Sequence, residues 1–123
     1  MMSSPYIQVF TRLRKIEEFG AALLKQTAAS DVSVTEAHIL KGLYVQDGQH
    51  ASALARAVGR AATSFTPLLD KLEKRGLIER RADAKDRRAV FIHLTSKGWA
   101  LRETIENVVA IIDEEFAGEG VPA

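Results

Sequence analysis

The stretch that most constrains the fold is residues 63–95, TSFTPLLDKLEKRGLIERRADAKDRRAVFIHLT. Its first part carries apolar residues at three- and four-residue spacing, namely Phe65, Leu68, Leu69 and Leu72. This period is typical of an amphipathic helix with one buried face. Gly76 follows directly, and glycine favours a helix end because it adopts left-handed backbone conformations without strain. The pattern therefore predicts a helix that stops at Gly76.

The residues after Gly76 predict a hairpin. Residues 89–95 alternate, with Val90, Ile92 and Leu94 on one face and Phe91 and His93 on the other, and residues 77–81 are the partner strand. Residues 82–88 between them are charged and turn-prone. A helix followed by a two-stranded hairpin with a basic tip is a winged helix. This shape suits duplex DNA, because a helix fits the major groove while a β-ribbon reaches the backbone or minor groove.

Charge is distributed unevenly along the chain. The 123 residues have a net charge of only +1, but residues 56–102 hold 12 Lys/Arg against 5 Asp/Glu, net +7. Residues 103–123 hold no Lys/Arg and 6 Asp/Glu, net −6. Such asymmetry is typical of a nucleic-acid-binding surface, although surface charge also serves solubility alone. Because the positive charge falls on the groove-shaped element, we favour DNA binding.

Pro67 leaves two starts open for the predicted helix. If the helix begins near Ala62, Pro67 lies inside it and removes one backbone hydrogen bond. If Thr66 is the N-cap, Pro67 occupies the first helical position without cost. We favour the earlier start. Either way Thr63, Ser64 and Thr66 lie at the N-terminal end, which meets base edges in recognition helices; helix capping is their alternative role.

The predicted hairpin tip is rich in cations. Residues 80–88 hold five Lys/Arg, which repel one another unless solvent or an anion such as phosphate screens them. Asp86 and Arg88 would share a face of an extended strand, so that the carboxylate orients the guanidinium; the alternative is a surface ion pair worth ~0–1 kcal/mol. The complete set of candidate DNA-binding residues is Arg60, Thr63, Ser64, Thr66, Lys71, Lys85, Asp86, Arg87 and Arg88.

Two further helices are predicted before residue 63. Ser33 and Glu36 fit a capping box, with Thr35 as an alternative cap. The helix that follows buries a face of Ala37, Leu40, Leu43 and Tyr44 and ends at Asp47-Gly48. A short helix over residues 51–58 ends at Gly59, and with the helix after it forms a helix-turn-helix.

Amphipathic helices are also predicted at both ends. Ser4-Pro5 starts a helix that runs to residues 27–30, and Thr95 or Ser96 caps one of about 20 residues, longer than a small winged domain needs. Their apolar stripes are expected to pack on each other, on a second subunit, or on both. The candidate dimerisation residues are Phe10, Leu13, Ile105, Val109, Ile112 and Phe116.

The motif in the middle of the chain resembles a known family. Residues 69–80, LDKLEKRGLIER, resemble the recognition helix and first wing strand of MarR-type transcriptional regulators. Residues 86–90, DRRAV, and 94–98, LTSKG, resemble that family's wing and the start of its last helix. The resemblance covers residues 33–98 well, and the flanking helices match by position and pattern only.

This resemblance implies a homodimer that binds a pseudo-palindromic operator and represses transcription. It also implies release, in many members, by a small aromatic or anionic ligand held between the dimer helices and the DNA-binding lobe. The chain departs from the family in having a single predicted C-terminal helix, so we expect a smaller or differently built dimer interface. It contains no cysteine, which excludes thiol-based peroxide sensing.

Other classes of protein find no support in the sequence. No apolar run approaches the ~20 residues of a membrane span and no signal peptide is evident, so a soluble cytoplasmic protein is expected. His38 and His50 lack a second ligand at metal spacing, and no catalytic constellation is present. We therefore expect no enzyme, no metal and no cofactor. A winged helix that binds protein instead of DNA is the alternative function.

Taken together, the patterns predict a mainly α-helical protein with a small β-hairpin. It is a winged helix-turn-helix flanked by N- and C-terminal dimerisation helices. We expect a single domain over residues 1–123, with an N-terminal dimerisation helix at 5–30, the winged helix-turn-helix at 33–95 and the C-terminal dimerisation helix at 96–118.

Overall fold

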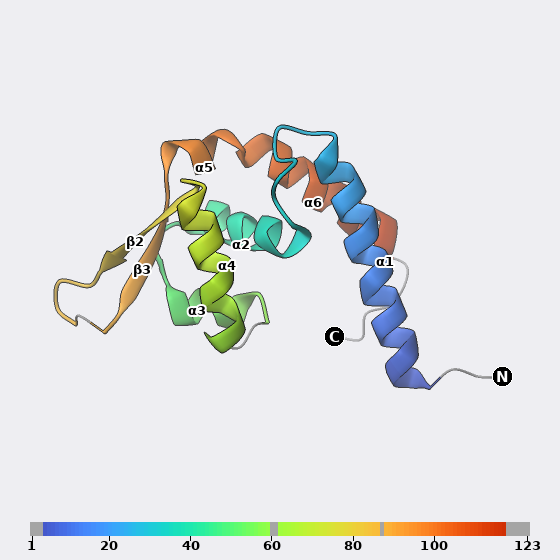
Figure 1. Cartoon of the computed structure of the whole chain (residues 1–123), viewed down its shortest axis with the longest axis horizontal. Helices are drawn as coiled ribbons and strands as arrows, with labels where there is room; N and C mark the ends of the chain where they lie inside the picture. The colour runs from blue at the N-terminus through green and yellow to red at the C-terminus, as the bar shows by residue number, and fades with distance from the viewer. Residues whose placement is uncertain (1–3, 60–61, 87, 118–123) are drawn as a thin grey trace.

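The computed structural model describes residues 4–59, 62–86 and 88–117. Its elements are, in chain order, α1 (Pro5–Lys25), α2 (Val34–Val45), β1 (Gln49–His50), α3 (Ala51–Ala57), α4 (Ala62–Lys74), β2 (Ile78–Ala82), β3 (Val90–Leu94), α5 (Ser96–Ala100) and α6 (Arg102–Phe116). The helices α3 and α4 and the hairpin of β2 and β3 lie at one end of the molecule, whereas α1 and most of α6 lie at the other (Figure 1). The mainly helical winged helix expected from the sequence is confirmed.

Side-chain caps begin three of the helices. Ser4 accepts a hydrogen bond from the Ile7 backbone N–H at 3.2 Å, with Pro5 in the first turn. Ser33 and Glu36 form the predicted capping box, so Ser33 rather than Thr35 is the cap. Thr95 accepts from the Gly98 N–H at 3.1 Å and is the cap of α5.

The end of α4 is as predicted, and its start is the earlier of the two considered. Gly76 has φ +75°. Its N–H donates to the Glu73 carbonyl at 2.9 Å, and the Leu77 N–H donates to the Leu72 carbonyl at 3.0 Å, which is a Schellman turn. The helix starts at Ala62, with Pro67 inside it.

The sheet has three strands, whereas the sequence predicted a two-stranded hairpin. The order is β1-β3-β2 and both pairings are antiparallel. In β1, Gln49 pairs with Ile92 and His50 pairs with Phe91. A strand of two residues is too short to produce an alternating pattern, so the sequence did not indicate it.

One hydrophobic core joins these elements, and α2 runs through its centre. Four apolar residues of α2 are fully buried: Ala37, Ile39, Leu40 and Leu43. They belong to one cluster with Leu24 of α1, Leu54 of α3, Leu72 of α4, Ile92 of β3 and Ile105 of α6. Burial of this apolar surface is the main force that assembles the module.

The C-terminal helix is broken, whereas the sequence predicted one helix from residue 96. The break is at Leu101, which has φ −88° and ψ 0° and separates α5 from α6. The two parts pack on different surfaces, which explains the turn between them. The start of α5 is bonded to the end of α4, whereas α6 packs against α1 and α2.

The contact between α5 and the end of α4 is made by hydrogen bonds. The Thr95 N–H donates to the Leu77 carbonyl at 3.1 Å, and the Lys97 ammonium donates to the Arg75 carbonyl at 2.9 Å.

Tyr44 of α2 donates to the Gly98 carbonyl at 2.7 Å. Burial, together with Glu106, raises the pKa of Tyr44 to about 12, so the phenol keeps its proton and donates this hydrogen bond into the alkaline range.

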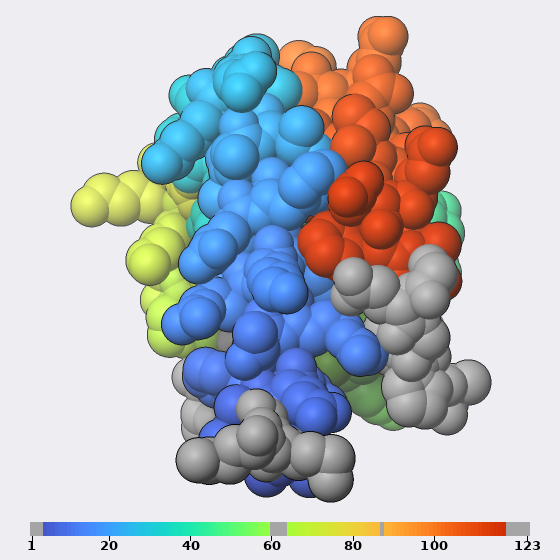
Figure 2. All heavy atoms as spheres, turned by 90° about the vertical axis from the view of Figure 1, so that its right-hand side faces the viewer, coloured from blue at the N-terminus to red at the C-terminus, as the bar shows by residue number. Residues whose placement is uncertain are grey.

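The first helix is shorter than predicted and partly uncovered. It ends at Lys25 rather than at residues 27–30, because the Thr27 hydroxyl donates to the Leu24 carbonyl at 2.7 Å and accepts from the Ala29 N–H at 3.0 Å. Figure 2 shows α1 and the C-terminal helix side by side. Gly20 permits this approach, since a Cβ there would lie 2.8 Å from the Ile112 side chain.

No helix among the described residues is both long and apolar enough to cross a membrane.

We predict that Gly98→Ala destabilises the fold by about 3 kcal/mol, a cost typical of forcing extra atoms into a packed site. A Cβ at this position would overlap the Leu77 carbonyl oxygen and lie 3.1 Å from a Leu94 methyl. Ser96→Ala, in the same helix and exposed, is the control and is expected to change little. Urea unfolding of both variants measures the difference. Equal stability of the two variants would show that α5 is not held tightly against Leu77.

Candidate nucleic-acid interface

The recognition helix α4 presents one apolar and one polar face. Phe65, Leu69 and Leu72 are buried in the core. Ser64 and Lys71, two of the candidate DNA-binding residues, lie on the exposed side. An amphipathic helix packed in this way offers its polar face as a rod of a diameter that the major groove accepts.

Two acidic side chains shape the tip of the hairpin. The Asp83 carboxylate accepts from the Lys85 N–H at 2.9 Å, and the Asp86 carboxylate accepts from the Arg88 N–H at 3.0 Å. The Asp86 carboxylate also lies 3.6 Å from the Arg88 Nε atom. The predicted contact between Asp86 and Arg88 is present, but in a turn between β2 and β3 rather than in an extended strand.

The cations of the hairpin fall into two groups. Lys85 is exposed, and the Arg88 side chain is 95% exposed, so both project from the tip. Arg80 is turned back toward α4, where it forms an ion pair with Asp70, and the Arg81 Nε donates to Glu79 at 2.6 Å. Of the four described cations in residues 80–88, Arg80 is therefore directed toward α4, and Arg81 is exposed but paired within its own strand.

A hollow of about 440 Å³ lies between α3, α4 and the hairpin. The candidate residues Thr66, Asp86 and Arg88 line it, together with His50 and Phe65. The ring of His50 lies 4.1 Å from that of Phe91, centre to centre. Elements distant in sequence thus bring the start of the recognition helix and the base of the wing tip to one surface.

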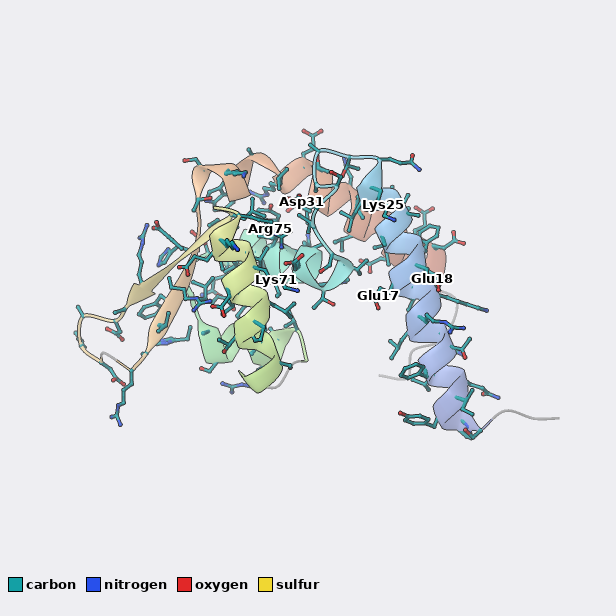
Figure 3. All side chains as sticks on the ribbon, viewed as in Figure 1. Glu17, Glu18, Lys25, Asp31, Lys71 and Arg75 are labelled. Atoms are coloured by element: carbon teal, nitrogen blue, oxygen red, sulfur yellow. The ribbon has the colours of Figure 1, made fainter. Side chains whose placement is uncertain are left out.

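The other candidate DNA-binding residues are placed differently. Lys71 lies farther along α4 and lines a second hollow, of about 380 Å³, together with Asp31 and Arg75 (Figure 3). Arg60 and Arg87 lie outside the described residues, and the side chain of Thr63 is not described. Among the described residues, no group of three or more His, Asp or Glu side chains is placed to hold a metal ion.

The candidate dimerisation residues divide between surface and core. Phe10 is 60% exposed and Leu13 is also exposed, beside Tyr6, Ile7 and Val9. Ile105, Val109 and Ile112 are buried in the chain's own core, and Phe116 packs edge-on against Phe19 with ring centres 5.6 Å apart. The last four residues therefore pack within the chain, and most of the exposed large apolar side chains lie on the N-terminal half of α1.

A network that the sequence analysis missed fixes the C-terminal end of α4. The Arg75 guanidinium forms an ion pair with Glu36 of α2 and donates to the Asp31 carbonyl. Glu36 is buried, and it also accepts from the Ser33 N–H at 2.9 Å. One signal was available: Arg75 lies three residues after Leu72 and so continues the buried stripe of the helix. A cation in that position indicates a buried anionic partner.

These elements define a class of protein. The helices α3 and α4 and the hairpin that follows them are the elements of a winged helix-turn-helix. Residues 32–90 match the model of the MarR family. The transcriptional regulator SarZ of Staphylococcus saprophyticus is 31% identical over 86 residues, which cover 70% of this chain and 59% of SarZ. The winged helix-turn-helix of this chain therefore resembles that of the MarR family.

A second relative and a solved structure extend the comparison. The transcriptional repressor MprA of Escherichia coli K12 is 47% identical over 55 residues, which cover 44% of this chain and 31% of MprA. The crystal structure of the S. aureus MepR–DNA complex superposes with a TM-score of 0.82 at 26% identity, covering 97% of this chain and 85% of the MepR chain. The chain spans 59% of SarZ and 31% of MprA, less than two thirds of either relative's length.

We predict that Arg75→Met lowers the free energy of unfolding by about 3 kcal/mol, because it leaves the Glu36 charge buried without its partner. Adding Glu36→Gln should restore part of the loss, since the buried charge is removed. Arg14→Met is the control, because the Arg14–Glu18 pair lies 3.9 Å apart on the surface of α1. Denaturant unfolding measures all three. A loss no larger than that of the control would contradict a structural role for the Arg75 pair.

Proposed function

We propose that the protein is a transcriptional regulator of MarR type that binds double-stranded DNA in a sequence-specific manner. The observation that carries this proposal is the shared surface of Thr66 and Arg88. It brings the start of the recognition helix next to an exposed arginine of the wing. Hydroxyl side chains at the start of a recognition helix meet base edges, and wing cations meet phosphate. The likeness of the fold to that of MepR, whose structure was determined in complex with DNA, also supports DNA binding.

The proposal includes a homodimer on a pseudo-palindromic operator. Its support is the exposed apolar face of α1, where the rings of Tyr6 and Phe10 stack with centres 6.2 Å apart. Apolar surface of this extent on one helix favours burial against a second subunit. A two-fold axis through that contact would place two recognition helices on successive major grooves, about 34 Å apart.

Repression and release by a small ligand complete the proposal. The name of the relative MprA, a transcriptional repressor, supports the sign of regulation. A hollow of about 280 Å³ between α1 and α2, lined by Leu13, Ile16, Glu17, Val34 and His38, is a candidate place for the ligand. Its apolar side chains suit an aromatic ring, whereas the Glu17 carboxylate disfavours an anionic group. Such a regulator would act in the cytoplasm, where it meets the DNA.

We predict steep salt dependence of binding to duplexes selected from a random pool, with a log–log slope of about −0.9 for each phosphate neutralised. Arg88→Ala should weaken binding to selected and random duplexes alike and reduce the slope by about 1. Ser64→Ala should instead change the preferred sequence. Fluorescence anisotropy across a salt series measures both. A flat salt response, or no binding at low salt together with capture of a protein partner, would favour the adaptor function instead.

We predict that Phe10→Asp weakens self-association at least about tenfold, because it would bury a charge in an apolar contact. Ala22→Asp places the same charge on an exposed position of the same helix and is the control. Sedimentation of the full chain over a range of concentrations measures the dimer fraction. Equal association of both variants would place the interface elsewhere.

A further inference from the structure

Arg80 of the hairpin forms ion pairs with the recognition helix. The Arg80 side chain is only 27% exposed, and its guanidinium forms an ion pair with Asp70 of α4. Its Nε lies 3.9 Å from Glu73, one helical turn farther along, and the Arg80 backbone N–H donates to the same carboxylate at 3.3 Å. Two acids of the recognition helix therefore hold one residue of the first wing strand. The Arg80 Nε atom is buried and has no hydrogen-bond partner among the described residues. The ion pairs of the guanidinium must therefore offset the free-energy cost of removing it from water.

Arg80 occupies the position where such a contact controls the hairpin's orientation. It lies in the middle of β2 and pairs with Ile92 of β3, so it is anchored to the sheet on one side and to α4 on the other. The neighbouring Arg81 is a contrasting case, because its partner Glu79 belongs to the same strand. That second pair joins no two elements and leaves the angle between hairpin and helix unchanged.

The two acids are unexpected on a helix that is to meet phosphate. Asp70 and Glu73 lie on the polar face of α4, with side chains 60% and 44% exposed, and negative charge there repels DNA. On charge alone, the helix would bind more tightly without them. Their presence is explained if the contact with Arg80 contributes more to binding than the repulsion costs.

We propose that Asp70, Glu73 and Arg80 form a clamp that fixes the angle of the wing against the recognition helix. Arg80 is thus a positioning residue, which acts through the wing-tip Arg88 and makes no phosphate contact of its own. The inference rests on the proposed DNA-binding function. It adds that helix and wing meet the duplex as one rigid unit. The conformational entropy of positioning Arg88 is therefore lost on folding rather than on binding.

The sign of a charge change tests the clamp. Asp70→Asn removes an acid from the recognition helix without changing its shape, so electrostatics alone predicts tighter binding. The clamp predicts that binding to the selected duplex weakens about tenfold, since the wing is released. Glu79→Gln removes one arginine-paired carboxylate from the neighbouring pair and is the matched control. Its binding should stay equal or become stronger.

A double-mutant cycle separates positioning from general destabilisation. In an Arg88→Ala background, Asp70→Asn should lose most of its effect, because the wing contact that it misplaces is already absent. The salt dependence of DNA binding by the double variant should also have the same slope as that of Arg88→Ala alone. In the free protein, hydrogen exchange of the backbone amides of residues 83–86 should be faster in Asp70→Asn than in Glu79→Gln.

The possible outcomes distinguish the two proposals. If the unchanged chain binds duplex DNA but Asp70→Asn binds equally or more tightly, the clamp is wrong and the DNA-binding function stands. Additive effects of Asp70→Asn and Arg88→Ala would also overturn the clamp. If the unchanged chain binds no duplex at low salt, the proposed function fails and the inference falls with it. Weaker binding, loss of additivity and faster exchange together support it.

Discussion

The arrangement of the winged helix-turn-helix depends on the backbone of residues 75–77. The recognition helix ends there in a Schellman turn, and the first wing strand begins directly after it. The carbonyls of Arg75 and Leu77 accept hydrogen bonds from Lys97 and Thr95, at the start of the last helices. The Arg75 side chain reaches the other way, to Glu36 at the start of α2. Because polar groups that leave water must find partners, these bonds fix the direction of the helix, the strand and the C-terminal segment at once.

Charge in the winged module is used for two purposes. Arg75 and Arg80 are held by the chain's own carboxylates and join elements to one another. Among the described residues of the tip, Lys85 and Arg88 are exposed and project into solvent, where a partner can reach them. The high positive charge of residues 56–102 is therefore a poor guide to the number of phosphate contacts, since part of it is neutralised inside the fold. Burial and pairing decide which cations serve which purpose.

Local signals in the sequence predicted much of this structure, and contacts between distant residues account for what it missed. The spacing of Phe65, Leu69 and Leu72, the glycine at 76 and the caps at Ser33 and Thr95 all act within one or two helical turns. Strand β1 and the break at Leu101 exist because β3 and α4 offer partners, and no local pattern encodes them. In the candidate site, Thr66 and Arg88 were predicted separately and share a hollow. The partners of Arg75 and Arg80 lie 39 and 10 residues away, so composition identified the charges but not their roles.

The short sheet has a further consequence for how the chain behaves among copies of itself. With the order β1-β3-β2, β1 and β2 are edge strands, and exposed strand edges can recruit strands from other chains into aggregates. One edge consists of only two residues, and the other carries Glu79, Arg80 and Arg81 within its five. A strand from another chain could form few backbone hydrogen bonds with β1, which has two residues, and would meet the charged side chains of β2. The wing can therefore protrude into solvent with little tendency to pair with strands of other copies.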